Sequence, residues 1–80
     1  MHELGVLCQA VNRVNRIAEE KQIQRIKHIT LEVGETSGYV PAFFEKLFPV
    51  AIDRFPVMKD AELWIQMAPG EGLLIREIGY

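Results

Sequence analysis

The sequence predicts an α+β fold: a two-layer sandwich in which two helices pack on one face of a three-stranded mixed sheet. Apolar residues recur at steps of three and four near the start of the chain, whereas later segments alternate apolar and polar residues. The expected order is helix, strand, helix, strand, strand. A helix between the first two strands permits a parallel crossover, so the sheet is expected to be mixed. With 80 residues, the chain is expected to form one domain, residues 1–80.

The first helix is predicted over residues 3–20. Its apolar stripe consists of Leu4, Leu7, Val11, Val14 and Ala18. Cys8 lies beside this stripe and is the only cysteine, which excludes an intramolecular disulfide and a cysteine-based zinc site. We therefore expect Cys8 to be a buried structural residue.

The first strand is predicted from the alternation of apolar and polar residues just before Gly34. Its apolar residues are Ile29, Leu31 and Val33, and its polar ones are His28, Thr30 and Glu32. Gly34 is expected to end the strand, and residues 35–38 to form a turn. His28 lies on the polar side and is expected to face solvent, with metal ligation as the alternative.

The second helix is expected to begin at Pro41, where the missing N–H of proline costs nothing. Its broad apolar face consists of Phe43, Phe44, Leu47, Phe48, Ala51 and Ile52. Such an aromatic stripe is typical of a core-facing helix. Pro49 lies inside this segment and is expected to kink or break the helix.

The last two strands are predicted over residues 61–67 and 73–78. Between them, Pro69-Gly70-Glu71-Gly72 is a strong turn signal. Because the turn is short, the third strand is expected to be the hairpin partner of the second.

Composition limits the classes of function. Hydrophobic residues make up 49% of the chain, and nine basic residues against eleven acidic ones give a net charge of −2. No run of like charge exists, so neither a nucleic-acid surface nor a polybasic membrane anchor is predicted. No apolar stretch is long enough to span a membrane and no signal peptide is visible, so a cytoplasmic location is expected. A nucleophile–base pair, a phosphate-binding loop and a carboxylate pair are all missing, so we do not expect an enzyme.

The chain opens with Met1-His2-Glu3, which we identify as candidate metal ligands. The α-amine of Met1, the backbone nitrogen of His2 and its ring Nδ1 form two fused chelate rings in one plane. Such nitrogen donors suit Ni(II) or Cu(II) and leave one in-plane position open. On these three residues alone, a solvated chain terminus is the alternative interpretation.

The sequence resembles the HypA/HybF family, the nickel metallochaperones of hydrogenase and urease maturation. The resemblance rests on the opening Met1-His2-Glu3-Leu4, on Leu31-Glu32-Val33-Gly34-Glu35-Thr36-Ser37-Gly38, on Pro41 and on Ala61-Glu62-Leu63. It implies a domain that binds Ni(II) at its N-terminus, delivers it for hydrogenase maturation and hands it to a partner GTPase. The fourth nickel position would be taken by Glu3, water or a second chain, so a dimer is left open.

The family pattern also includes a zinc domain with two Cys-x-x-Cys pairs between the second and third strands. Residues 69–72 stand where that domain would be inserted, so we expect a nickel-binding domain without zinc, either engineered or natural. One alternative function is a metal-independent interaction module that docks the partner GTPase, with Trp64 and Tyr39 as candidate anchors. Another is an artificial metal-site scaffold.

Overall fold

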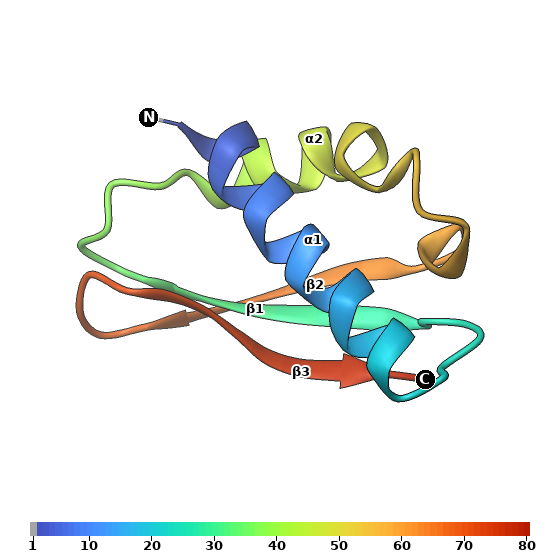
Figure 1. The fold of residues 1–80 in the computed structure, drawn as a ribbon. Helices are drawn as coiled ribbons and strands as arrows, with labels where there is room; N and C mark the ends of the chain where they lie inside the picture. Colours follow the sequence, from blue (N-terminus) through green and yellow to red (C-terminus); the bar gives the residue numbers. More distant parts are fainter. Residues whose placement is uncertain (1) are drawn as a thin grey trace.

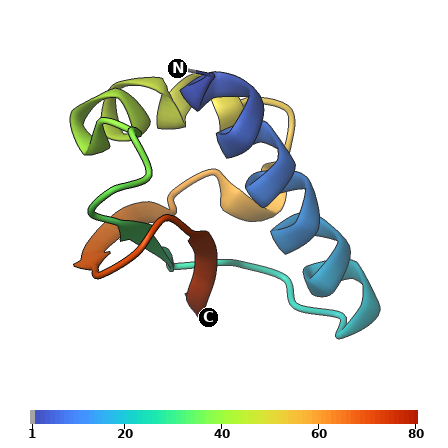
Figure 2. The same ribbon diagram turned by 90° about the vertical axis from the view of Figure 1, so that its left-hand side faces the viewer.

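The computed structural model describes residues 2–80, which form two helices, one short 3₁₀ helix and three strands. In chain order they are α1 (Glu3–Glu20), β1 (His28–Gly34), α2 (Pro41–Ile52), the 3₁₀ helix η1 (Pro56–Met58), β2 (Glu62–Ala68) and β3 (Leu73–Gly79). Both α-helices lie on the same side of the sheet (Figures 1 and 2). The predicted α+β fold is therefore confirmed. No helix in the described part of the chain is long and apolar enough to cross a membrane.

The sheet has the strand order β2-β1-β3, so β1 is its central strand. β2 pairs with β1 in parallel, with Leu31 opposite Ile65. β3 pairs with β1 antiparallel, with Leu31 opposite Ile75 and a register shift next to Thr30. The prediction that β3 is the hairpin partner of β2 is therefore wrong, although the mixed sheet is confirmed. β2 and β3 lie on either side of β1, so residues 69–72 must cross its end.

Gly34, the last residue of β1, makes this crossing possible. Its N–H donates to the carbonyl of Gly72 at 2.7 Å, and the Thr36 hydroxyl donates to the carbonyl of Gly70 at 2.8 Å. A Cβ at position 34 would collide with the carbonyl of Gly70 and lie 2.8 Å from the nitrogen of Gly72. Residues 69–72, rich in glycine and proline, thus form a loop that passes over the end of β1. A hairpin turn has the same composition, so the sequence could not distinguish the two.

The core lies between the helices and the sheet. It consists of Leu7, Ala10, Val11, Val14, Ala18, Ile26, Ile29, Leu31, Val33, Phe44, Phe48, Ala51 and Met58. The bounds predicted for α1 are confirmed, but its buried face differs from the predicted stripe. Leu4 is 41% exposed, whereas Glu3 and Ala10 are buried. Because Glu3 and Ala10 share the buried side with Leu7, this face is rotated away from Leu4.

Helix α2 begins at Pro41, as predicted, and continues through Pro49 to Ile52. Of the kink or break expected at Pro49, the break is therefore wrong. Pro49 lies in the last turn, where its missing N–H costs one helical bond, that to the carbonyl of Glu45, and buried Phe48 and Ala51 hold that turn against the core. Phe43, which was predicted to belong to the apolar face, is 50% exposed.

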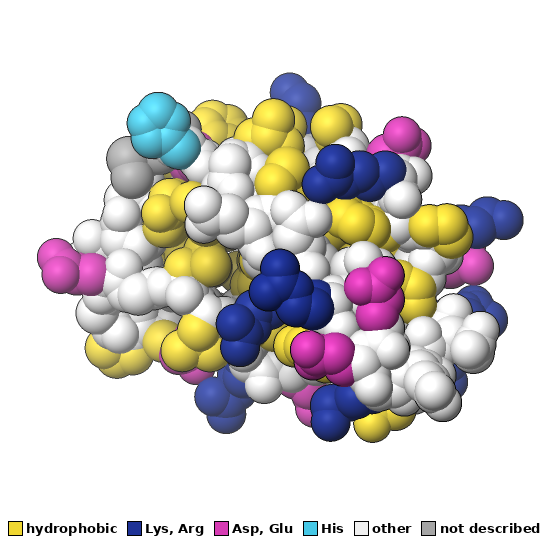
Figure 3. Space-filling model, in the orientation of Figure 1, with side chains coloured by type: hydrophobic (Ala, Val, Ile, Leu, Met, Phe, Trp, Pro, Cys, Tyr) yellow, Lys and Arg dark blue, Asp and Glu magenta, His cyan; other side chains and the backbone are white. Residues whose placement is uncertain are grey.

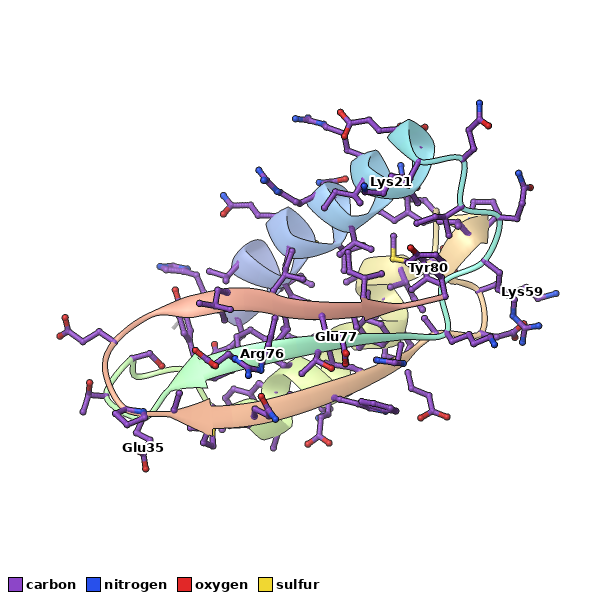
Figure 4. The ribbon with its side chains drawn as sticks, turned by 90° about the horizontal axis from the view of Figure 1, so that it is seen from below. Lys21, Glu35, Lys59, Arg76, Glu77 and Tyr80 are labelled. Carbon is purple, nitrogen blue, oxygen red and sulfur yellow. The ribbon has the colours of Figure 1, made fainter. Side chains whose placement is uncertain are left out.

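The face of the sheet turned away from the helices is partly covered by its own side chains. The imidazole of His28 stacks on Trp64, with ring centroids 3.7 Å apart, and its Nε2 lies 3.3 Å from Oε1 of Glu77. The His28 side chain is only 19% exposed, so the expectation that it faces solvent is corrected. Residues from both neighbouring strands enclose it, and it fits because Gly79, opposite it on β3, has no side chain. Figure 4 views this face and labels Glu77.

Candidate metal site

The predicted ligands lie at the start of α1. Met1 lies outside the described residues. His2 is the N-cap residue of α1, and its backbone carbonyl accepts a hydrogen bond from the Val6 N–H at 3.1 Å. Its side chain is exposed and, within residues 2–80, makes no capping bond to the helix. The imidazole is therefore available to a ligand from solvent. Figure 3 shows a histidine side chain projecting at this end of the molecule.

Glu3, the next residue, points the other way. Its side chain is only 4% exposed, and Oε2 accepts a hydrogen bond from the backbone N–H of Val40 at 3.0 Å. Val40 is the N-cap residue of α2, and α2 has no side-chain cap of its own among the described residues. Glu3 therefore supplies an acceptor to the start of α2 and ties it to the start of α1.

The electrostatics at Glu3 favour its charged form. The Val40 N–H lowers the pKa of Glu3 below the ordinary value of 4.5, and this effect outweighs burial, which would raise it. The first turns of α1 and α2 both place partial positive charge near the carboxylate. The same two helix ends disfavour a metal cation, so donors that lose protons on binding are needed to offset that field.

The structure thus separates two of the predicted ligands: the His2 side chain is exposed, whereas the Glu3 carboxylate is buried and hydrogen-bonded. Within residues 2–80, no three His, Cys, Asp or Glu side chains come together in a group that could hold a metal ion. His28 belongs to β1, which starts at the end of the molecule opposite the start of α1 (Figure 1).

Cys8 is only partly buried, which differs from the predicted full burial. It packs against the core and lines a small cavity between α1 and α2, beside Val50, Ala51 and Phe55. Asp53 and Arg54 line the same cavity, but within residues 2–80 no group of three metal-ligating side chains forms there.

The bond between Glu3 and Val40 was not foreseen from the sequence. The two residues are 37 positions apart, so no local pattern connects them. One signal was present, however: the residue before Pro41 is a valine, which cannot cap a helix with its side chain. The first N–H groups of α2 therefore needed an acceptor from elsewhere in the fold.

Comparisons with known proteins agree on one family. Residues 1–73 match the family model HypA, described as hydrogenase/urease nickel incorporation, metallochaperone, hypA. The hydrogenase maturation factor HypA of Methanosarcina barkeri is 35% identical over 69 residues, which cover 86% of this chain and 51% of that protein. HypA of Trichodesmium erythraeum is 39% identical over 72 residues, covering 90% of this chain and 60% of that protein.

A solved structure has the same fold. It is the solution structure of the Ni metallochaperone HypA from Helicobacter pylori, with a TM-score of 0.78 and 21% sequence identity. The match covers 96% of this chain and 72% of that one. The chain spans between half and two thirds of the length of these curated relatives.

Proposed function

Because its residues 1–73 match the family model, the chain belongs to the HypA family, and we propose that it is a nickel-binding domain that carries Ni(II) for hydrogenase maturation. HypA proteins are metallochaperones and maturation factors, not enzymes. Nickel would accordingly be a cargo that is bound and released. The observation that carries the proposal is the exposed His2 at the start of α1, inside the matched region.

We propose the α-amine of Met1, the backbone nitrogen of His2 and its ring Nδ1 as the nickel donors. These three nitrogens form a planar set with one position open, as Ni(II) and Cu(II) prefer. The exposed imidazole of His2 supports this proposal. Because deprotonated donors are required, the site would release nickel as protons return.

Glu3 remains a predicted fourth ligand, but it would have to give up its hydrogen bond to Val40 in order to reach the metal. We therefore favour water or a second chain in the fourth position. In that arrangement, Glu3 supports the site indirectly by holding the start of α1 against α2.

We further propose that residues 1–80 act as one nickel-binding domain that needs no zinc. Its only cysteine, Cys8, cannot supply a thiolate cluster. Neither the deletion of a zinc domain nor the handover of nickel to a partner GTPase follows from the matches, and both stay predictions from the resemblance.

Calorimetric titration with Ni(II) tests the proposal. Untagged protein should bind one ion per chain, and one extra residue before Met1 should remove most of the affinity because it destroys the fused chelate rings. His2→Ala should have the same effect. His28→Ala is the matched control, because it removes the only other histidine and should leave the affinity unchanged. If His2→Ala titrates like the parent, the site lies elsewhere.

A metal-independent interaction module is the alternative that an observation favours. Trp64 is 47% exposed and is a candidate anchor for a partner. Tyr39 fits this role less well, since it is half-buried and its ring packs against Phe44 with centroids 5.6 Å apart. Binding of a partner that is equally strong with and without nickel would support this alternative.

A further inference from the structure

A groove runs between α1 and the outer strand β3. It consists of two cavities of about 590 and 320 Å³, the first at the N-terminal half of α1 and the second at its C-terminal half. Arg13 and Ile75 line both cavities, so the two adjoin. We call this feature the α1–β3 groove.

β3 is an edge strand, because the described residues place β1 on one of its sides and no strand on the other. An edge strand presents unpaired backbone N–H and C=O groups to solvent, which are available to a further strand. Figures 2 and 4 show that α1 lies on the β3 side of the sheet and projects beyond that edge. A strand added to β3 would therefore lie beneath the helix.

The helix-facing side chains of β3 are incompletely covered. Ile75 and Ile78 are half-buried, whereas Leu31 and Ile29, their partners in the register on β1, are 0% and 2% exposed. Both isoleucines line the groove together with Ile17 of α1. The groove thus offers an apolar floor along an open backbone edge.

The α1 side of the groove carries positive charge, whereas the side formed by β3 and the loop before it carries Glu71, Arg76 and Glu77. Arg13 lies where the two cavities meet, and Lys21 lies at the C-terminal end of the helix. Both side chains are exposed, and neither makes an ion pair with any other residue in the 2–80 range. Figure 3 shows Lys and Arg side chains between hydrophobic patches on this face, with Asp and Glu side chains beside them, and Figure 4 labels Lys21 near Tyr80 at the end of the groove.

We propose that the α1–β3 groove binds an extended acidic segment of a partner protein, which adds to β3 as a fourth strand. Its backbone would pair with the free edge, as in other cases of strand addition. On the helix-facing side of the added strand, which every second residue occupies, apolar side chains would cover Ile75 and Ile78 and carboxylates would face Arg13 and Lys21. A second copy of this chain fits less well, because two α1 helices would bring Arg13 and Lys21 toward their own counterparts.

The groove also reaches toward the proposed nickel site. Its N-terminal cavity includes Val6, whose N–H is bonded to the carbonyl of His2. One end of a bound segment would therefore lie about one helical turn from His2. This last step rests on the proposed function, but the docking of the segment does not.

Titration of metal-free, ¹⁵N-labelled protein with synthetic peptides, followed by NMR, tests this proposal. The probe is a short acetylated peptide in which every second residue is valine or glutamate in turn, with threonine between them, so that valine and glutamate lie on the same face of the strand. It should bind saturably, shift the amide signals of β3 and of the groove side of α1, and slow hydrogen exchange in β3. Arg13→Glu should weaken binding about tenfold. Lys46→Glu makes the same change of charge at an exposed position of α2, outside the groove, and should leave binding unchanged.

Two control peptides separate the components of the interaction. A peptide with lysine in place of glutamate tests the charge, and one with N-methylated backbone positions tests strand pairing; both should bind at least about tenfold more weakly. The proposal is overturned if the lysine peptide binds equally well or if the shifts fall on β2 or α2. It is also overturned if β3 signals move with protein concentration alone, which would identify a second copy as the occupant. Nickel affinity is measured separately, so a failure here leaves the proposed function untouched.

Discussion

At the scale of single residues, the start of α1 divides its two polar side chains between solvent and protein. His2 is exposed, whereas Glu3 is buried and holds the Val40 N–H at 3.0 Å. The exposed imidazole suits exchange of a metal with solvent, and the buried carboxylate suits a structural role. Adjacent residues of one motif thus support different parts of the proposed function, which leads to one prediction for each.

We expect nickel affinity to rise with pH through neutrality. The α-amine of a chain terminus has a pKa of about 8, and both it and the His2 amide must lose protons to bind in the proposed mode. Calorimetry at several pH values and in buffers of different ionisation enthalpy should show proton release with each nickel bound. An affinity independent of pH would contradict the proposed donors.

Glu3→Gln should destabilise the protein most near neutral pH and least in acid. The lowered pKa of Glu3 means that its carboxylate stabilises the folded state above the ordinary value of 4.5. This contribution is lost as the pH falls through the lower pKa of the folded state. Urea unfolding across the acid range should therefore show the parent losing more stability than the variant. Parallel curves would indicate that the charge of Glu3 contributes little.

At the scale of elements, the crossing of residues 69–72 over the end of β1 holds the sheet in the order β2-β1-β3. The bonds from Gly34 to Gly72 and from Thr36 to Gly70 fix the loop to that end. Nothing larger than glycine fits at position 34, because the loop backbone occupies the place of a side chain. This contact, rather than a hairpin, determines where β3 starts.

Gly34→Ala should lower the free energy of unfolding by roughly 3 kcal/mol, the upper end of what overpacking costs, because the loop backbone must move. Gly72→Ala is the matched control in the same loop, since a Cβ there meets no atom within 4 Å. It should change stability by less than about 0.5 kcal/mol. Equal effects in the two variants, measured by denaturant unfolding, would show that the loop does not rest tightly on Gly34.

At the scale of the whole molecule, one apolar layer between two helices and three strands must hold the fold. No disulfide is available to the single Cys8. Each helix contributes one face to the core, and both outer strands leave inward-facing side chains half-buried. Partial cover of this kind gives a small stability margin, and on β3 it also provides the floor of the α1–β3 groove.

Removal of metal ions should leave the fold intact. The core described above contains no His, Cys, Asp or Glu side chain, so a strong chelator should not change the circular dichroism spectrum. The margin expected for a domain of this size is roughly 3–5 kcal/mol. The measurement is denaturant unfolding with and without chelator, and the two curves should coincide. A loss of structure on chelation would mean that a metal ion stabilises the fold.

The sequence by itself predicted the two α-helices and the three strands, because their signals are local, but not the 3₁₀ helix η1. The three-and-four spacing of α1 and the alternation of β1 depend on neighbouring side chains, and α1 has its predicted bounds. Pro41 at the start of α2 is local in the same sense. The exposure of His2 belongs here too, since a residue at the start of a helix needs no distant partner to remain accessible.

Tertiary structure alone decided which distant segments meet. The pattern of residues 73–78, although its alternation is imperfect, predicts a strand, but it carries no information on whether the partner is β1 or β2. His28 looked polar and exposed, yet Trp64 and Glu77 enclose it because three strands bring them together. Glu3 likewise acquired its role only when α2 placed the Val40 N–H beside it. In each instance, the free energy of the contact depends on a residue that is distant along the chain, and local sequence patterns cannot report it.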